Sequence, residues 1–438
     1  MRRTRRLLAT MLILAVGLLT MAAPAMAEEK EEITLTVAWG ALESTIYDQW
    51  METFFTPYME ANPNVTINFI AQNAIQDTVR VQIGVGAGPD IFMADCFDLA
   101  DYAESGRILD MDKYAEQYGW YDRFLDWAMA SCEYDGVLYG VPNSADVTGL
   151  YYNADMLKEL NLELPTNREE YVAALQAAVD AGYTGISLGI SDGALNAQWI
   201  IDHYMTCVLG KEGIEKLFTG ELKFTDPEVS EVFAQLKADW DAGFINNKLS
   251  GAITGEEGRA IFVNGNALFN PEGCWLSNGC VPPDTWTFDW EFVPWPSMKE
   301  GIPAAGGTGL GDMFLVNAAT KYPDACADLL NFMFADQERL AYGVSKGMNI
   351  PCVEMGLEDF PEGTSQDVID TVVAFSEISA LDSVSYCPWS GYPADTNIWL
   401  YENISKLWYD EFTLDQFLAG AQEVLDKDLD AGFTFVAY

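Results

Sequence analysis

The spacing of hydrophobic residues along the first hundred positions predicts alternating strands and helices. Hydrophobic and polar residues alternate along 33–39, which predicts a strand, and hydrophobic residues recur every three to four positions along 45–61, which predicts a helix. A second strand (65–70), a second helix (73–85) and a third strand (90–94) follow. This order is typical of a doubly wound α/β domain.

From about residue 145 the pattern becomes mainly helical. Helices are predicted over 168–181, 227–242 and 322–334, and two more in the last forty residues, separated near Thr413. The segment 264–269 is predicted to be extended, and the Pro-, Trp- and Gly-rich stretch 282–311 is interpreted as a crossing region. We therefore expect two lobes joined by more than one strand.

The N-terminus has the pattern of an export signal. A basic start precedes the hydrophobic run 7–19 and the small residues of Ala25-Met26-Ala27. Residues 1–27 are therefore predicted to be a signal peptide cleaved after Ala27, because the run is too short for a membrane anchor. We expect an exported protein, periplasmic or extracellular. The first cysteine is Cys96, so no lipid-anchor cysteine follows the predicted cleavage site, and how the protein is retained stays open.

Charge excludes several classes of partner. The 438 residues include 23 Lys and Arg against 67 Asp and Glu, a formal net charge of −44, so we expect no nucleic-acid partner and no docking on anionic lipid. Half of the residues are hydrophobic, which predicts a packed globular protein. A single His leaves little material for a metal site, and we expect no metal and no cofactor.

Eight cysteines in an exported chain permit disulfides. Cys274 and Cys280 are spaced to close a small loop over 275–279. Free buried thiols are the alternative for this pair and the expectation for the other six.

Several short motifs occur between residues 33 and 345. They are GPDIF (88–92), LADY (99–102), GRILD (106–110), YDG (134–136), GVP (140–142), TGLYYN (148–153), FVNG (262–265), GCW (273–275) and GGTG (306–309). In this order the set resembles the carbohydrate-binding group of the extracellular solute-binding proteins of ABC importers, the maltose-binding protein family.

The resemblance implies an α/β, two-lobed periplasmic-binding-protein-like fold with a hinge and an interlobe ligand cleft. It assigns 28–145 plus 292–345 to lobe I and 146–291 plus 346–438 to lobe II. It also implies a monomer without enzymatic activity that captures a carbohydrate and delivers it to an ABC transporter membrane permease. The supply of thirteen Trp favours an oligosaccharide.

Five residues are the main candidates for ligand contact. Sugars present hydroxyl groups and apolar C–H faces, so a sugar site needs flat aromatic rings and polar side chains. Trp39 and Asp95 follow predicted strands, where ligands bind in such sheets. The resemblance adds Asp146 at the hinge, and Trp199 and Trp275 in the second lobe.

Further candidates come from loops and the return crossing. Trp389 lies between Pro388 and Gly391 in a predicted loop, whereas Trp399 is expected to pack on a helix. Gly307 and Thr308 are candidates because their backbone amides can approach hydroxyl groups closely. Asp312 is a weaker candidate.

A hydrolase is the first rival interpretation. The sequence 185–189 fits the G-x-S-x-G pattern of a nucleophile elbow around Ser187, but His203 is the one available base and follows after only sixteen residues. Such crowding makes a catalytic triad a poor interpretation. A secreted glycoside hydrolase stays open in principle, since an acidic chain offers pairs of carboxylates.

Another ligand for the same fold is the stronger rival. An acidic cleft with aromatic rings also suits a polyamine, whose ammonium groups pair with carboxylates and aromatic faces. Tyr151 and Tyr152 are adjacent, as in ferric-ion binders, but alternation along a strand points them to opposite faces, which favours packing. We expect a sugar in preference to a polyamine.

Overall fold

The computed structural model describes residues 31–40, 44–72, 75–193, 196–282 and 285–435. The predicted signal peptide and its cleavage site lie outside these residues. The strands are β1 (Ile33–Trp39), β2 (Val65–Ala71), β3 (Ile91–Ala94), β4 (Glu133–Tyr134), β5 (Val137–Leu138), β6 (Gly140–Asn153), β7 (Thr184–Ile186), β8 (Ala267–Gly273), β9 (Trp290–Val293), β10 (Gly307–Val316) and β11 (Ser385–Tyr386).

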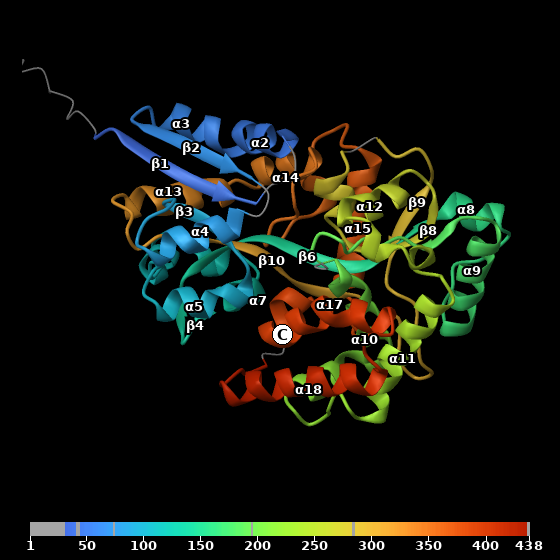
Figure 1. The fold of residues 1–438 in the computed structure, drawn as a ribbon. Coiled ribbons are helices and arrows are strands. Elements are labelled where there is room, and N and C mark those ends of the chain that lie inside the picture. The colour runs from blue at the N-terminus through green and yellow to red at the C-terminus, as the bar shows by residue number, and fades with distance from the viewer. Residues whose placement is uncertain (1–30, 41–43, 73–74, 194–195, 283–284, 436–438) are drawn as a thin grey trace, which may run out of the picture.

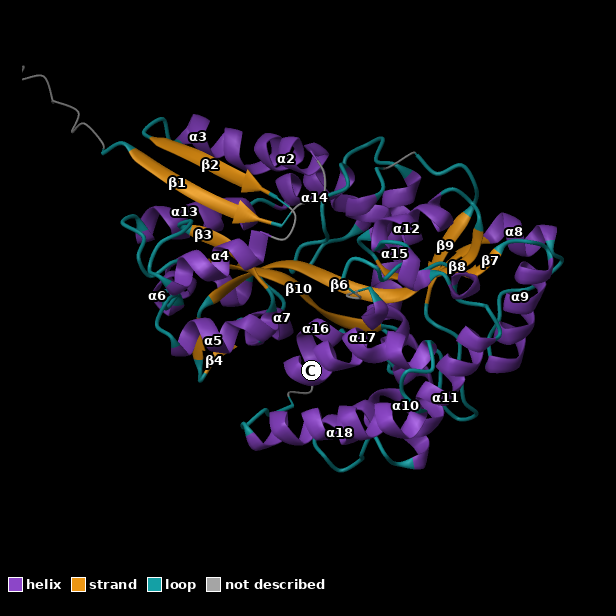
Figure 2. Ribbon diagram, viewed as in Figure 1, coloured by secondary structure: helices purple, strands orange, loops and turns teal. Residues whose placement is uncertain are grey.

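Helices surround the strands on both sides (Figures 1 and 2). They are α2 (Ser44–Trp50), α3 (Thr56–Ala61), α4 (Ile75–Gly84), α5 (Leu99–Glu104), α6 (Asp112–Tyr118), α7 (Asp126–Ala130), α8 (Ala154–Glu159), α9 (Arg168–Asp180), α10 (Ala197–Phe218), α11 (Pro227–Asp241), α12 (Gly255–Val263), α13 (Pro323–Phe334), α14 (Gln337–Ser345), α15 (Gln366–Ser379), α16 (Pro388–Gly391), α17 (Ala394–Trp408) and α18 (Leu414–Asp430). Among the described residues, no helix is long and apolar enough to cross a membrane.

One mixed sheet runs through the molecule in the order β2-β1-β3-β10-β6-β8-β7, with β11 pairing with β10 and β9 pairing with β6. β1 is parallel to β2 and β3, whereas β10 is antiparallel to β3 and β6. The long strands β6 and β10 lie side by side and connect the two ends of the sheet (Figure 1). The predicted strand–helix–strand order of the first hundred residues is confirmed.

The pairing of β6 with β10 is irregular near its middle. The register shifts on both sides of Asp312, so Asn143 and Gly311 have no directly opposite partner. Such a bulge bends the strand and redirects its side chains. It lies where the two crossing strands pass between the ends of the sheet, and it places Gly311 and Asp312 at the site described below.

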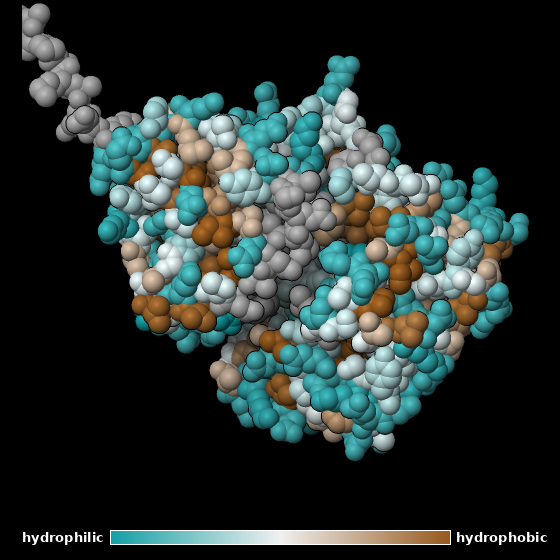
Figure 3. Space-filling model, turned by 45° about the horizontal axis from the view of Figure 1, so that its top comes forward, coloured by the Kyte–Doolittle hydropathy of each residue, from teal (hydrophilic) through white to brown (hydrophobic). Residues whose placement is uncertain are grey.

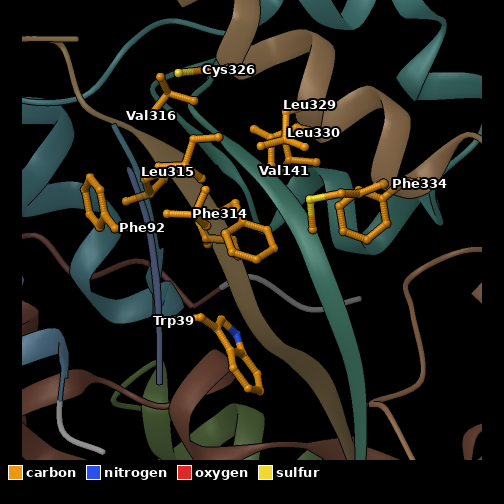
Figure 4. Packing of buried hydrophobic residues seen from close by; sticks show 14 of the residues in the cluster. Trp39, Phe92, Val141, Phe314, Leu315, Val316, Cys326, Leu329, Leu330 and Phe334 are labelled. Carbon is orange, nitrogen blue, oxygen red and sulfur yellow. The ribbon is translucent and has the colours of Figure 1, made fainter. Parts of the chain in front are cut away.

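Two large hydrophobic clusters form the core. The first packs around β1, β3 and β10 and includes Phe92 and Phe314, with Trp39 at one end of the labelled residues (Figure 4). The second packs around α10, α11, α17 and α18 and includes Phe233 and Phe417. Two separate cores agree with a two-lobed fold. On the face drawn in Figure 3, hydrophobic residues form only small groups.

The packing refines the proposed lobe boundaries. Trp295 and Met298 pack in the second cluster, whereas Met348 and Cys352 pack in the first. The sequence prediction had placed the first two in lobe I and the last two in lobe II. We retain the two lobe ranges as a proposal, but assign Trp295 and Met298 to lobe II and Met348 and Cys352 to lobe I.

Two local expectations can be compared with the structure. The predicted helix 45–61 is confirmed: helical backbone runs from Ser44 to Ala61, with a wider π-helical stretch at Met51–Phe55 between α2 and α3, and Trp50 and Tyr58 are buried. Cys274 and Cys280 are not joined to each other, so the spacing did not produce the disulfide considered for them. Instead, a turn that begins at Trp275 separates them, with the Cys280 amide donating to the Trp275 carbonyl.

Candidate ligand-binding site

Two adjoining cavities lie beside the crossing strands. The first, which we call the tryptophan cavity, has a volume of about 270 Å³ and is lined by Asp95, Asp146, Gln198, Trp199, Trp275, Gly311, Pro388, Trp389, Tyr392, Ala394, Asn397, Ile398 and Tyr401. The second, the Trp39 cavity, has a volume of about 220 Å³. Asp146, Trp275 and Gly311 line both cavities, so the two are neighbours.

Three tryptophans form one aromatic cluster in the tryptophan cavity. The ring centroids of Trp199 lie 5.1 Å from those of both Trp275 and Trp389, and Trp275 and Trp389 are 5.4 Å apart. Trp199 and Trp389 are almost perpendicular, at 85°. These separations are typical of stabilising edge-to-face pairs, so each ring fixes the orientation of the others.

Hydrogen bonds hold two of the three indoles in place. Trp275 Nε1 donates to Glu272 Oε1 at 2.8 Å, and Trp389 Nε1 donates to the carbonyl oxygen of Leu310 at 2.9 Å. Trp199 is only 8% exposed, and its Nε1 has no hydrogen-bond partner among the described residues. The indole nitrogens of Trp120, Trp295 and Trp408 in the hydrophobic cores are buried without a partner in the same way, so the missing partner does not by itself mark Trp199 as a ligand contact.

A glycine makes room for the Trp275 ring. A methyl group at Gly273 would overlap the six-membered ring of Trp275, which lies against the backbone at this position. Gly273 is the last residue of β8, two residues before the tryptophan. The absence of a side chain therefore sets where the indole lies.

Three carboxylates approach one another from separate strands. Asp95 follows β3 directly, Asp146 lies in β6, and Asp312 lies at the bulge in β10. The pKa of Asp146 is raised to about 8, first by burial and then by the charges of Asp312 and Asp95. Burial raises the pKa of Asp95 to about 7, with Asp98 and Asp312 adding to the effect and Arg80 opposing it.

The three carboxylates differ in their hydrogen bonding. Asp312 accepts hydrogen bonds from Asn143 Nδ2 at 2.7 Å and from Ser144 Oγ at 3.2 Å. Burial raises the pKa of Asp312 to about 6, and these hydrogen bonds oppose that rise. In the described part of the chain, no group donates a hydrogen bond to the side chains of Asp95 or Asp146. These two carboxylates are therefore available as ligand acceptors.

A methyl group at Gly311 would overlap the carboxylate of Asp146 and the hydroxyl of Ser144. Gly311 is thus the position where the crossing strands leave space for the acidic side chain.

The structure brings together five of the predicted residues in the tryptophan cavity: Asp95, Asp146, Trp199, Trp275 and Trp389. Trp39 lines the Trp39 cavity, together with the weaker candidate Asp312. Trp399 belongs to the helix α17 and packs against Phe417 of α18, with ring centroids 5.0 Å apart, as expected.

Gly307 and Thr308 line neither cavity. The Gly307 amide donates to Thr148 Oγ1 at 3.0 Å, and Thr308 Oγ1 donates to the carbonyl oxygen of Asp146 at 3.4 Å. A side chain at Gly307 would collide with Thr148 and approach Asp202. These hydrogen bonds therefore join the two crossing strands, β10 and β6, to each other.

Sequence reasoning missed several polar residues of the tryptophan cavity. Asn397 Nδ2 donates to Gln198 Oε1 at 3.2 Å, and Tyr401 also lines the cavity from α17. The charge of Asp95 contributes to the raised pKa of Tyr401, after burial and Glu402, which shows that α17 faces the carboxylates. Only the position of Gln198, one residue before a predicted tryptophan, offered a signal.

The nucleophile-elbow pattern does not form a triad. Ser187 is fully buried and accepts a hydrogen bond at 2.8 Å from Asn270 Nδ2. His203 stacks on Trp295 at 5.0 Å, and burial lowers its pKa to about 3. Tyr151 and Tyr152 pack in different clusters, as alternation predicts. Among the described residues, no group of three or more His, Cys, Asp or Glu is placed to hold a metal ion.

The chain belongs to the bacterial extracellular solute-binding protein family, whose model matches residues 41–339. It is therefore a binding protein and not an enzyme. It is 23% identical to the maltodextrin-binding protein MdxE of Bacillus subtilis (strain 168) over 357 residues, which is 75% of this chain and 76% of that protein. It is 20% identical to the multiple sugar-binding protein of Streptococcus mutans over 298 residues, 65% of this chain and 68% of that protein.

The fold is similar to those of solved structures. A chitin oligosaccharide binding protein superposes with a TM-score of 0.80 at 19% identity, covering 92% of this chain and 100% of that one. Maltose-bound T. maritima MalE3 superposes with a TM-score of 0.72 at 15% identity, covering 90% of this chain and 99% of that one. These likenesses establish the two-lobed α/β fold.

Proposed function

We propose that the protein captures an oligosaccharide outside the cytoplasmic membrane and delivers it to the permease of an ABC transporter. One observation carries the ligand class. Three tryptophan rings within 5.4 Å of one another share a cavity with two carboxylates that accept no hydrogen bond from the described residues. Aromatic faces suit the C–H faces of sugar rings, and the carboxylates suit their hydroxyl groups.

Both lobes contribute to this cavity, which supports closure as the mechanism. Asp95 follows β3 in the first part of the sheet, whereas Trp199 and Trp389 belong to α10 and α16. A ligand that contacts both sides stabilises the closed form by its additional contacts. The closed form would then be recognised by the permease. We also propose that the protein is a monomer and that the signal peptide is removed after Ala27.

Thermal unfolding in the presence of candidate ligands tests the proposal. A ligand at about 100 times its Kd stabilises the folded state by about 2.7 kcal/mol, which raises Tm measurably. We expect a rise with oligosaccharides and none with ferric citrate. No rise with any of a broad set of mono- and oligosaccharides would contradict the proposal. N-terminal sequencing of the exported protein tests the cleavage site.

A polyamine is the second candidate, and the three neighbouring carboxylates favour it. Its ammonium groups would pair with the carboxylates, and its alkyl chain would lie on the tryptophans. A rise in Tm with spermidine or putrescine, and with no sugar, would establish this alternative.

A further inference from the structure

The carboxylates of the cleft have no cation to balance them. Arg259 is the one basic residue in the described lining of the two cavities, and it is bound to Glu272 at 2.9 Å and to Glu256 at 2.6 Å. Arg80, near Asp95, is paired with Asp98 at 2.5 Å. Each nearby cation thus already has a carboxylate partner of its own.

The remaining segments add no balancing charge. The stretches 41–43, 73–74, 194–195, 283–284 and 436–438 contain neither Lys nor Arg, so basic residues beyond the described ranges occur only in 1–30. Asp95, Asp146 and Asp312 are therefore left without an ion pair of their own; the charge of Asp312 raises the pKa of both Asp95 and Asp146, and the charge of Asp95 raises that of Asp146. The raised pKa of Asp146 keeps this carboxyl group largely protonated at pH 7, and an ammonium group placed beside it would favour its ionised form.

The carboxylates are spread along the cleft. Asp95 lines the tryptophan cavity, Asp312 lines the Trp39 cavity, and Asp146 lines both. Since these residues form no cluster placed to hold a metal ion, one small cation does not fit the arrangement. An elongated ligand with several cationic groups fits it better.

One indole of the tryptophan cavity has a donor that a ligand oxygen could satisfy. Trp199 Nε1 is a buried donor without a partner among the described residues. An alkyl polyamine has no oxygen to accept this hydrogen bond, whereas a sugar has hydroxyl and ring oxygens. The site therefore combines carboxylates that suit a positive charge with a donor that suits sugar-like acceptors.

We infer that the ligand is an oligosaccharide of amino sugars, whose ammonium groups bind Asp95, Asp146 and Asp312 while its rings contact the tryptophans. This inference rests on the proposed function and narrows its ligand class. An amino sugar and a free polyamine both carry ammonium groups that carboxylates can bind. The experiment below distinguishes these two ligand classes.

The test uses β-1,4-linked trisaccharides that differ only at carbon 2. Calorimetric titration at pH 7 compares glucose, N-acetylglucosamine and glucosamine forms, with spermidine and putrescine as further ligands. We expect the glucosamine form to bind at least tenfold more tightly than the glucose form. Equal or tighter binding of either neutral form would overturn the inference and leave the oligosaccharide proposal standing. Binding of the polyamines alone would overturn both, whereas binding of none of the five would overturn this inference and leave the oligosaccharide proposal to the broader set of sugars.

Variants locate the charge effect. Asp146→Asn and Asp95→Asn keep the size of each side chain but remove its charge, and each is expected to reduce the preference for the glucosamine form at least fivefold. Glu402→Gln is the matched control, because Glu402 is an exposed residue of α17 that lines neither cavity. An unchanged preference in both aspartate variants would overturn the assignment to these carboxylates. The comparison of ligands on the unaltered protein holds even where a variant fails to fold.

Discussion

Glu272 accepts the hydrogen bond of Trp275 Nε1 at 2.8 Å while it is ion-paired with Arg259 at 2.9 Å. Glu272 is only 2% exposed, so its charge depends on the guanidinium. The pair fixes the plane of an indole that lines both cavities. The position of the proposed ligand platform is thus set by a buried ion pair from α12 and β8.

Replacement of Glu272 should therefore affect both stability and binding. We expect Glu272→Ala to lower the free energy of unfolding by about 3 kcal/mol, because it removes one partner of a buried pair. Denaturant titration measures this change. The Glu256 side chain is 59% exposed, so it is the more exposed partner of Arg259. Glu256→Ala should therefore lower the free energy of unfolding by less than about 1 kcal/mol. Equal losses of unfolding free energy in the two variants would contradict the expectation that the buried partner contributes more.

Trp275→Ala should weaken ligand binding by about 1–3 kcal/mol, roughly a five- to 150-fold rise in Kd, because it removes a stacking face. Titration calorimetry measures the Kd. Trp275→Phe keeps an aromatic ring but loses the hydrogen bond to Glu272. Its Kd should therefore lie between those of the unaltered protein and of Trp275→Ala. Unchanged affinity in a folded Trp275→Ala protein would remove this residue from the site.

Gly273→Ala tests the position of the Trp275 indole while leaving the tryptophan itself unchanged. The added methyl group would overlap the indole of Trp275 and displace it, so we expect affinity to fall at least tenfold. Gly84→Ala is the matched control, since a methyl group there, at the end of α4, meets nothing within 4 Å. This control should bind as the unaltered protein does. Normal affinity in Gly273→Ala would show that the ring can move without loss.

The raised pKa of Asp146 predicts a dependence of stability on pH. Its pKa is about 8 in the folded protein against an ordinary value near 3.8, so the folded form holds this proton more tightly. The contribution to stability is therefore largest below about pH 4 and is lost as the pH rises towards 8. Asp146→Asn cannot ionise, so its Tm should exceed that of the unaltered protein increasingly between pH 5 and pH 8. A difference in Tm between the two proteins that stays constant from pH 5 to pH 8 would contradict the raised pKa of Asp146.

The local elements could be predicted because their signals are local. The bounds of β1 agree with the predicted 33–39, and α9 and α13 agree within one residue. The π-helical stretch within the helix 45–61 was not visible, since Trp50, Phe54 and Tyr58 keep a helical spacing through it. The interpretation of 282–311 as a crossing region was wrong for most of its length, because β9 and the buried Trp295 and Met298 lie there and only 307–311 belong to the crossing strand β10. The bulge around Gly311 depends on the pairing of β10 with β6.

The candidate site was predicted in part, through the residues that carried the family resemblance and those that end strands. Asp95, Asp146, Trp199, Trp275 and Trp389 meet in one cavity. Gly307 and Thr308 do not, because their polar groups are used by the crossing strands.

The sequence by itself determined the types of residue, the spacing that forms strands and helices, and the excess of acidic over basic charge. Only the tertiary structure decided that Trp199 and Trp389, 190 positions apart, lie 5.1 Å from each other, and that Asp95 and Asp146 line the same cavity. Periodicity records the neighbours of a residue along the chain, whereas burial, pKa and ligand contact depend on neighbours brought together by packing.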